Sequence, residues 1–238
     1  MLMQADAAAL EIRVAAFLSQ DAVLIDEIVN GKDLHTDNQT RFGLPSRLIA
    51  KVLNFRILYG GNEYSFANDP EFTTVSKSEK YWKEVIEAYY EKYKGIRQWH
   101  SKIIREVVET GQLVMPTGRV YKFEKFDRGY KDTQIKNFGV QGSGADIMAI
   151  ARVSAYNRIK KLGYGDRCLF VNTVHDSLIL DYCDKTCDSY TLAETMYSVF
   201  RDIPLNFERL FGVPFNVPMA AEVLVGKDWK DMNELPKR

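Results

Sequence analysis

The chain has 238 residues, of which 46% are hydrophobic, 12% aromatic and 27% charged, and its formal net charge is zero. This composition is typical of a globular protein with a sizeable core, and it excludes collagen-like, low-complexity and disordered classes. No apolar run approaches the ~18 residues needed to cross a membrane. The first residues lack the basic start of a secretory signal, and the three cysteines have neither metal-ligand nor disulfide spacing. We therefore expect a reduced, cytoplasmic protein.

The charge is distributed unevenly along the chain. Residues 1–30 hold one Lys or Arg and five Asp or Glu (net −4), residues 31–131 hold 18 and 13 (net +5), and residues 132–238 hold 13 and 14 (net −1). A basic middle segment favours binding to a phosphate-rich partner, and carboxylates elsewhere in the chain can coordinate metal ions. A surplus of this size is also compatible with an ordinary solvated surface.

Helices dominate the predicted elements of the first half. In chain order we predict a strand over 1–6 and helices over 7–20, 33–41, 46–60, 76–95 and 96–110. Asp33 and Ser46 are predicted N-caps, and Gly60-Gly61 and Gly111 are predicted stops. The segment Ser76–Glu79 has capping-box spacing and opens an aromatic-rich helix that ends near Gly95.

Strands return in the second half. We predict hairpin strands over 113–115 and 120–123, a helix over 133–160 interrupted at Gly142–Gly144, strands over 168–173 and 177–182, a helix over 189–210 and a strand over 220–225. This order predicts an α+β fold, in which a helical insertion separates the first strand from a late antiparallel hairpin.

The helix predicted from Arg47 to Tyr59 carries two cations and two aromatic rings on one face. Its residues are spaced four apart, and each residue turns the helix by about 100°. Arg47 and Lys51 occupy the N-terminal half of this stripe, and Phe55 and Tyr59 the C-terminal half. A nucleoside triphosphate has the matching layout of a polyanion beside a stackable base. An ordinary amphipathic helix with solvated cations and buried rings has the same spacing.

Two aspartates occupy positions where side chains converge beside a sheet. Asp6 ends the first strand, and Asp176 lies in the turn between two later strands, beside His175. Two carboxylates ~4 Å apart repel by about 4 kcal/mol at an effective dielectric of ~20, so they require a shared proton or a divalent metal. Mg²⁺ prefers such oxygen ligands. Spacing alone does not bring residues 6 and 176 together.

A glycine-rich segment follows Asn137, from Gln141 to Asp146. Small residues permit a close approach of another chain segment, and Asn and Gln side chains can donate to minor-groove acceptors of any base pair. Helix packing explains the same residues.

Taken together in this order, these segments resemble the family A DNA polymerases, the DNA polymerase I-like group, especially its phage members. Residues 6–13 (DAAALEIR) are similar to motif A, residues 174–176 (VHD) to motif C, and residues 47–60 (RLIAKVLNFRILYG) match the motif B pattern RxxxKxxNFxxxYG. Residues 141–146 (QGSGAD) and the segment from Glu222 to Trp229 are also similar to family segments. The resemblance covers essentially the whole chain.

This resemblance implies a polymerase palm, an antiparallel sheet with helices, and a mainly helical fingers insertion. The palm would comprise residues 1–25 and 137–238, and the fingers residues 26–136 with the motif B helix at 46–60. The family also has a thumb, an upstream palm segment and often an exonuclease domain. We therefore expect a separate chain or a missing N-terminal region to supply the thumb. The resemblance also implies a bacterial cytoplasm, with a phage gene as one origin.

The resemblance implies specific roles for the motif residues. Asp6 and Asp176 would hold two Mg²⁺ ions. Arg47, Lys51 and His35 would clamp the triphosphate of an incoming dNTP, and Lys51 is a candidate for protonating the pyrophosphate leaving group.

The remaining roles concern the nucleotide pocket and the primer-template DNA. Phe55 and Tyr59 would line the pocket, and Glu11 would lie under the sugar as a steric gate against a 2′-hydroxyl. The template, primer or primer terminus would contact three further residues: Asn137, Gln141 and His175.

The sequence departs from the family pattern in two places that affect the site. Residues Ala7–Ala9 replace the usual Tyr-Ser-Gln of motif A, and Ser177 replaces the glutamate that often ends motif C. The implied metal site therefore rests on Asp6 and Asp176 alone.

The predicted function is DNA-templated DNA polymerisation by two-metal nucleotidyl transfer. One alternative is a half of a split polymerase that binds dNTP and DNA but needs a thumb-bearing partner for activity. A second is a metal-dependent nuclease, against which the cation-aromatic stripe argues because hydrolysis needs no base-stacking wall.

Overall fold

The structure is a computed structural model that describes residues 1–235. The chain divides into two compact units. Unit 1 comprises Met1–Leu10 together with the described chain from Ser143 onward, and unit 2 comprises Glu11–Gly142. The assignment of residues 1–25 and 137–238 to a palm and of 26–136 to fingers stays a prediction.

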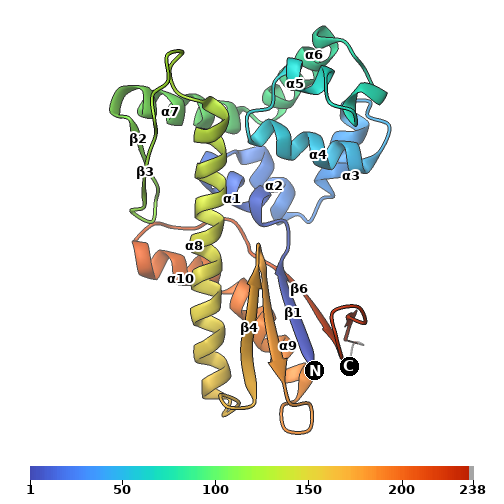
Figure 1. Cartoon of the computed structure of the whole chain (residues 1–238), viewed down its shortest axis with the longest axis vertical. Coiled ribbons are helices and arrows are strands. Elements are labelled where there is room, and N and C mark those ends of the chain that lie inside the picture. Colours follow the sequence, from blue (N-terminus) through green and yellow to red (C-terminus); the bar gives the residue numbers. More distant parts are fainter. Residues whose placement is uncertain (236–238) are drawn as a thin grey trace. The chain divides into compact units, whose positions relative to one another are not determined.

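Unit 1 is built on a five-stranded antiparallel sheet with the strand order β4-β5-β1-β6-β7. Its strands are β1 (Leu2–Ala7), β4 (Cys168–Val174), β5 (Ser177–Tyr182), β6 (Ala221–Gly226) and β7 (Asn233–Glu234). The first strand of the chain therefore lies in the centre, between the late hairpin and β6 (Figure 1). The predicted strands and the α+β class are confirmed, whereas β7, with two residues, is too short to leave a sequence pattern.

The central strand is buried on one face by small and medium side chains. Met3, Ala5 and Ala7 are fully buried, whereas the residues between them are partly exposed, which is the alternation of a strand with one covered face. In β5, Leu178, Ile179 and Leu180 are all buried, so this strand is covered on both faces. The helix α9 (Ser189–Arg201) packs against β1 and β6.

Two helix predictions in this part of the chain are wrong. The helix predicted over 189–210 is two helices, α9 and α10 (Ile203–Phe211), which meet at Asp202. Pro204 lies in the first turn of α10, where its missing N–H is tolerated, but it could not continue α9 without losing a hydrogen bond.

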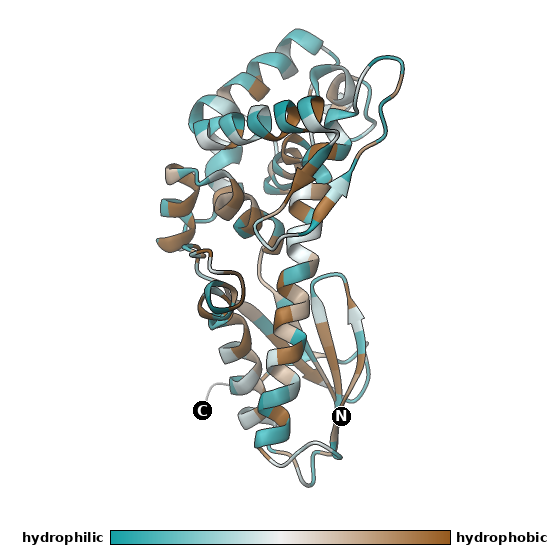
Figure 2. Ribbon diagram, turned by 90° about the vertical axis from the view of Figure 1, so that its left-hand side faces the viewer, coloured by the Kyte–Doolittle hydropathy of each residue, from teal (hydrophilic) through white to brown (hydrophobic). Residues whose placement is uncertain are grey.

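The helix α8 (Asp132–Lys161) runs without a break for 30 residues, so the interruption predicted at residues 142–144 is also wrong. Gly142 has a packing reason instead: a Cβ there would overlap the phenol of Tyr121. Alternating hydrophobic and hydrophilic residues are visible along α8 in Figure 2.

Unit 2 is mainly helical. It contains most of α1 (Leu10–Ser19), followed by α2 (Ala22–Val29), α3 (Leu34–Arg41), α4 (Arg47–Leu58), α5 (Glu63–Ala67), a 3₁₀ turn (Phe72–Thr74), α6 (Glu79–Lys92), α7 (Lys94–Thr110) and the hairpin β2 (Gln112–Val114) and β3 (Val120–Lys122). The predicted helices and hairpin are confirmed, and α2 and α5 are additional. Asp33 and Ser46 cap α3 and α4 as predicted, but Ser78, not Ser76, caps α6.

A buried aspartate joins α2 to α7. Asp21, 2% exposed, accepts the Leu24 amide through Oδ1 at 2.9 Å and the Gly95 amide through Oδ2 at 2.6 Å. A Cβ at position 95 would lie 2.6 Å from the Asp21 Cα, so only glycine fits. Gly95 lies in the first turn of α7, and the aromatic-rich helix α6 ends three residues earlier, at Lys92.

Aromatic side chains supply much of the interior of unit 2. The Phe66 ring stacks on Trp82 at 5.4 Å between centroids and meets Phe72 edge-on at 4.8 Å, and all three side chains are fully buried. Within residues 1–235, no helix combines the length and apolar character needed to cross a membrane.

Candidate functional site

The sheet pairing of unit 1 brings the segments that carry Asp6 and Asp176 side by side. Asp6 stands opposite Ser177 in the β1–β5 register, and the Ala7 amide donates to the Asp176 carbonyl oxygen at 2.9 Å. Sequence spacing left this juxtaposition open, because it depends on the pairing of strands about 170 residues apart in the chain.

Ser177 links Asp6 to a second polar side chain. Its hydroxyl donates to Asp6 Oδ2 and accepts from Gln4 Nε2 at 3.2 Å, and Ser177 itself is 4% exposed. One Asp6 oxygen is thereby held by a neutral donor from the strand that begins after Asp176. In the sequence, Ser177 is notable only because it replaces the glutamate that often ends motif C, and its contact with Asp6 could not be predicted.

His175 lies in the tight turn between β4 and β5. Val174 pairs with Ser177, so only His175 and Asp176 form the connection, and His175 adopts a φ of 52°. A positive φ is uncommon for residues other than glycine but is required in a two-residue hairpin of this hand. The side chain of His175 is exposed and that of Asp176 half-buried.

The donor set at this end of the sheet fits Mg²⁺. Among residues 1–235, no group of three or more His, Cys, Asp or Glu side chains is placed to hold a metal ion. Mg²⁺ is commonly bound by one or two protein carboxylates together with substrate phosphates and water, rather than by an all-protein cage. Asp6 and Asp176 match that requirement.

In unit 2, helix α4 presents the predicted stripe. Ser46 caps the helix by accepting the Ile49 amide, and Ile49, Ala50, Leu53 and Ile57 on the opposite side are buried. The stripe itself has Arg47 and Lys51 exposed and Phe55 and Tyr59 half-buried, with the cations nearest the helix N-terminus. The cations and the positive end of the helix dipole therefore coincide.

Arg47 is engaged by the cap of the neighbouring helix. Its Nε donates to Asp33 Oδ2 at 2.8 Å and its Nη2 to Oδ1 at 3.2 Å. This two-pronged contact holds the pKa of Asp33 well below its usual range and raises that of Arg47. Asp33 was predicted only as an N-cap, because a sequence pattern does not indicate which residues pair across helices.

His35 belongs to the same cluster. Its ring lies 6.1 Å from that of Phe55, and its Nδ1 is 3.0 Å from Asn54 Nδ2. Partial burial, followed by the positive charges of Arg47 and Lys51, lowers the pKa of His35 below 6.5. This shift favours the neutral form of the ring.

A third set of contacts joins three motif segments of unit 2. The Tyr59 hydroxyl donates to Glu11 Oε1 at 3.2 Å, and Gln141 Nε2 donates to the Tyr59 oxygen at 2.6 Å and lies 3.5 Å from Glu11 Oε1. Burial and the Glu11 charge raise the pKa of Tyr59, so its proton stays available as a donor. Asn137 lies four residues before Gln141 and hence on the same face of α8.

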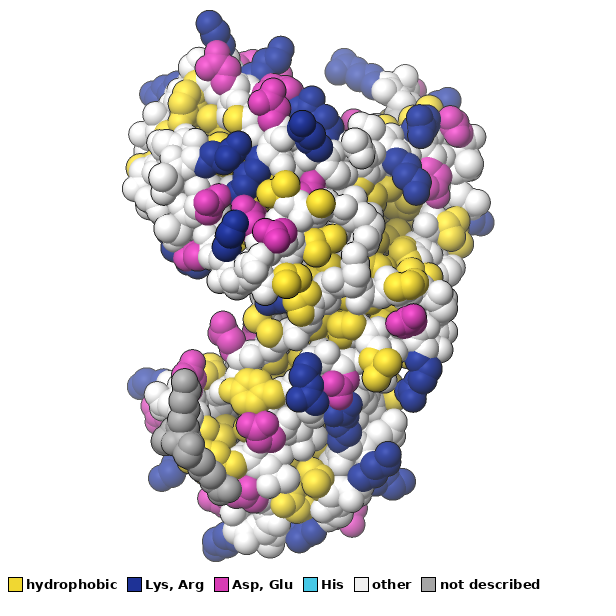
Figure 3. All heavy atoms as spheres, turned by 180° about the vertical axis from the view of Figure 1, so that it is seen from behind, with side chains coloured by type: hydrophobic (Ala, Val, Ile, Leu, Met, Phe, Trp, Pro, Cys, Tyr) yellow, Lys and Arg dark blue, Asp and Glu magenta, His cyan; other side chains and the backbone are white. Residues whose placement is uncertain are grey.

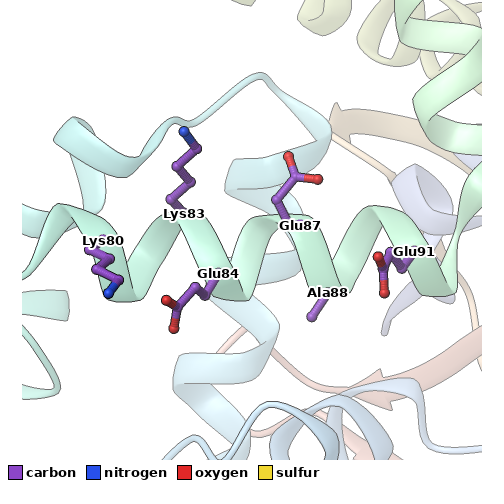
Figure 4. Close-up of a pocket in the computed structure, with 6 residues that line it drawn as sticks. All are labelled: Lys80, Lys83, Glu84, Glu87, Ala88 and Glu91. Carbon is purple, nitrogen blue, oxygen red and sulfur yellow. The ribbon is translucent and has the colours of Figure 1, made fainter.

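Two surface depressions do not add to these sites. One lies along α6 and is lined by side chains of that helix alone, with lysines at one end and glutamates towards the other (Figure 4). The other, of about 570 Å³, lies between α8 and α10 in unit 1, with exposed Val153 and Leu210 in its lining. On the face shown in Figure 3, basic and acidic side chains are interspersed rather than gathered by sign.

Comparison with known proteins identifies one family. The family described as DNA polymerase family A matches residues 1–231. DNA polymerase I of Lactococcus lactis subsp. lactis is 31% identical over 196 residues, covering 76% of this chain and 22% of that protein. The thermostable DNA polymerase I of Thermus filiformis is 28% identical over 248 residues, covering 98% of this chain and 27% of that protein. The chain thus spans about a quarter of the length of these relatives.

A solved structure shares the fold. The POL domain of Pol1 from M. smegmatis, solved in complex with a DNA primer-template and dNTP, superposes with a TM-score of 0.80 at 24% identity and covers 96% of this chain and 40% of that one.

Proposed function

The chain belongs to the family A DNA polymerases, and from this premise we propose that it is the catalytic portion of a DNA-templated DNA polymerase. In the reaction, the primer 3′-oxygen forms a bond to the α-phosphorus of a dNTP, the bond from that phosphorus to the β-phosphate oxygen breaks, and pyrophosphate leaves. The 3′-hydroxyl loses its proton to solvent water in the same step. We assign residues 1–25 and 137–238 to the palm and residues 26–136 to the fingers.

Asp6 and Asp176 are the proposed ligands of two Mg²⁺ ions, and their placement at one end of the sheet supports this role. When bound, the metals would supply charge stabilisation to the attacking and leaving oxygens of an in-line displacement. Ser177 keeps one oxygen of Asp6 engaged, which orients the carboxylate. Asp176, in the short turn, has little backbone freedom to move away.

The face of α4 is the observation that carries the proposal. Arg47 and Lys51 bind the triphosphate, together with His35, and Lys51 donates a proton to the departing pyrophosphate. Phe55 and Tyr59 cover the base and sugar. A hydrolase acting on phosphodiesters needs the carboxylates and metal but gains nothing from the two rings, so this face favours nucleotide addition over a nuclease.

Glu11 would discriminate between sugars. Its carboxylate is fixed by the Tyr59 hydroxyl, so a ribose 2′-hydroxyl brought against it would meet a group that cannot move aside cheaply. Phe55 lacks the hydroxyl of a tyrosine, and we expect discrimination against 3′-deoxy chain terminators. Asn137, Gln141 and His175 are the proposed contacts to primer-template DNA.

Single-nucleotide primer extension with Mg²⁺ tests this function. The purified chain should add only the templated dNTP, and Asp6→Ala or Asp176→Ala should abolish addition while leaving metal-free triphosphate binding largely intact. Lys51→Ala should weaken triphosphate binding, whereas Lys80→Ala, an exposed lysine on α6, should not. Untemplated addition, or addition that persists in Asp176→Ala, contradicts the proposal.

The same experiment distinguishes the alternatives. Absent incorporation with Lys51-dependent triphosphate binding would favour half of a split polymerase, active only with a chain that supplies the thumb. Metal-dependent shortening of the primer without addition would favour a nuclease.

A further inference from the structure

A buried lysine stands at the start of a chain of hydrogen bonds that ends at His35. Lys92, the last residue of α6, has 5% of its side chain exposed. Its ammonium contacts Glu27 Oε1 at 2.9 Å, Asp37 Oδ2 at 2.6 Å and Asn38 Oδ1 at 2.7 Å. An ammonium has three donors and no acceptor, so these three contacts use its full capacity.

The lysine orients the side-chain amide of Asn38. Because Lys92 can only donate, the group of Asn38 that faces it must be the oxygen. The Tyr93 hydroxyl is compatible with this orientation. It donates to Glu27 Oε2 at 2.8 Å, and its oxygen then accepts from Asn38 Nδ2 at 3.3 Å, with Asn38 Oδ1 at 3.4 Å. Asn38 is fully buried.

The orientation is passed to the next amide. Asn38 Nδ2 donates to Asn54 Oδ1 at 3.0 Å, so Asn54, 2% exposed, must direct its Nδ2 towards His35. Asn54 Nδ2 lies 3.0 Å from His35 Nδ1. A donor at that distance requires a lone pair on Nδ1, so in a neutral ring the proton is on Nε2.

We propose that Lys92, acting through Asn38 and Asn54, sets the tautomer of His35, so that the neutral ring accepts at Nδ1 and offers Nε2–H as a donor to a phosphate oxygen of the incoming nucleotide. The donor role rests on the proposed function, whereas the tautomer does not. Lys92, Asn38 and Asn54 are positioning residues. The charged groups beside the ring are Asp33 on its own helix and Arg47 and Lys51 on α4, and the two cations oppose protonation of His35.

The advantage of this arrangement is that His35 Nε2 already carries its proton, and so can donate to phosphate, before the nucleotide binds. A histidine free to exchange tautomers presents a lone pair to phosphate for part of the time, and lone pair and phosphate oxygen repel. Fixing Nε2–H removes that state before the nucleotide arrives.

Two nearly isosteric variants give opposite expectations. In Asn38→Asp, the new carboxylate still pairs with Lys92 but has no donor, so Asn54 should turn its amide nitrogen towards residue 38 and its oxygen towards His35. His35 must then hold its proton on Nδ1. In Asn54→Asp, a carboxylate faces Nδ1 directly, so the ring should become protonated on both nitrogens. Removing Lys92 is a poorer test, because it leaves Glu27 buried without its cation.

Long-range ¹H–¹⁵N spectra of ¹⁵N-histidine protein near pH 7.5 report these states directly. The chain has three histidines, and His35→Gln assigns the relevant signals. We expect the Nε2–H tautomer in the wild type, Nδ1–H in Asn38→Asp and a doubly protonated ring in Asn54→Asp. His100, whose Nδ1 lies 3.0 Å from the Tyr90 hydroxyl, reports that each variant is folded. A wild-type Nδ1–H tautomer, or an unchanged tautomer in folded Asn38→Asp, overturns the proposal.

Titration with a dNTP tests the donor role separately. Asn38→Asp should raise the triphosphate Kd about tenfold or more, the effect of losing a hydrogen bond to a charged group. If the tautomer switches while the Kd of Asn38→Asp stays at the wild-type value, the assignment of His35 to the triphosphate is wrong. Templated incorporation by the wild type then shows independently whether the polymerase function itself stands.

Discussion

The Tyr59 hydroxyl donates a hydrogen bond to the carboxylate of Glu11, 48 residues earlier in the chain, at 3.2 Å. Glu11 belongs to α1, and Tyr59 is the C-cap residue of α4. Gln141 of α8 donates a hydrogen bond to the Tyr59 oxygen at 2.6 Å. Three segments that are far apart in the sequence thus share one set of hydrogen bonds in unit 2.

This cluster predicts how sugar selectivity responds to mutation. Glu11→Ala should lower the preference for dNTP over rNTP by at least tenfold, because the barrier to the 2′-hydroxyl is removed. Tyr59→Phe keeps the ring and the carboxylate but loses a hydrogen bond worth ~0.5–1.5 kcal/mol, so the preference should fall by only about twofold to tenfold. The measurement is the ratio of incorporation efficiencies for matched dNTP and rNTP. Equal ratios in Glu11→Ala and the wild type would contradict the role of Glu11.

The Asp33–Arg47 ion pair predicts a gain of affinity on mutation. A triphosphate must compete with Asp33 for the Arg47 guanidinium, and the Asp33 carboxylate also repels it. Asp33→Asn can still cap α3, yet it releases Arg47, so triphosphate affinity should rise about twofold to fivefold.

Equilibrium titration with a dNTP checks this prediction. The matched control is Asp69→Asn, which releases Arg56 from a 2.7 Å ion pair away from the stripe and should leave affinity unchanged. A loss of affinity in Asp33→Asn would mean that Asp33 positions Arg47 for the nucleotide instead of competing with it.

The double cap at Asp21 predicts a loss of stability. Asparagine offers one carbonyl oxygen and one amide, so Asp21→Asn can accept from either Leu24 or Gly95 but not from both. We expect the free energy of unfolding to fall by ~1–3 kcal/mol, measured by urea denaturation. Asp188→Asn, at the N-cap of α9, should change it little, because Asn is an equivalent cap for a single helix.

His100 predicts a pH dependence of stability. Burial, followed by the nearby charge of Lys136, lowers the pKa of His100 to about 3 in the folded chain, against 6.5 when unfolded. The unfolded chain therefore binds a proton that the folded chain rejects. The contribution of His100 is complete above pH 6.5 and is lost as the pH falls towards 3, with a slope of at most ~1.4 kcal/mol per pH unit.

Between pH 6.5 and 5 the histidines with lowered pKa, His100 and His35, determine the slope measured by denaturation, because carboxylates with lowered pKa contribute mainly at lower pH. His100→Gln should flatten the slope of the unfolding free energy in this window. A variant slope as steep as that of the wild type would assign the pH dependence to other groups.

Local physics explains what could be predicted from the sequence. The caps Asp33 and Ser46, the hairpin around residues 116–119 and the stripe on α4 follow from contacts within a few residues, so spacing and residue type suffice. One error arises where local information is insufficient. Gly142 and Gly144 favour a helix break, and the sequence does not indicate that Tyr121 packs against Gly142.

The sequence by itself determined which chemistry is present: two aspartates at strand and turn, a cation-aromatic helix face and a glutamate in the first helix. Only the tertiary structure decided which partners these groups have. Strand pairing brings residue 6 beside residue 177, Asp33 occupies Arg47, and Lys92 reaches His35 through two buried amides. The physical reason is that hydrogen-bond polarity and pKa depend on which distant groups are desolvated together, and burial of that kind exists only once the helices and strands have packed.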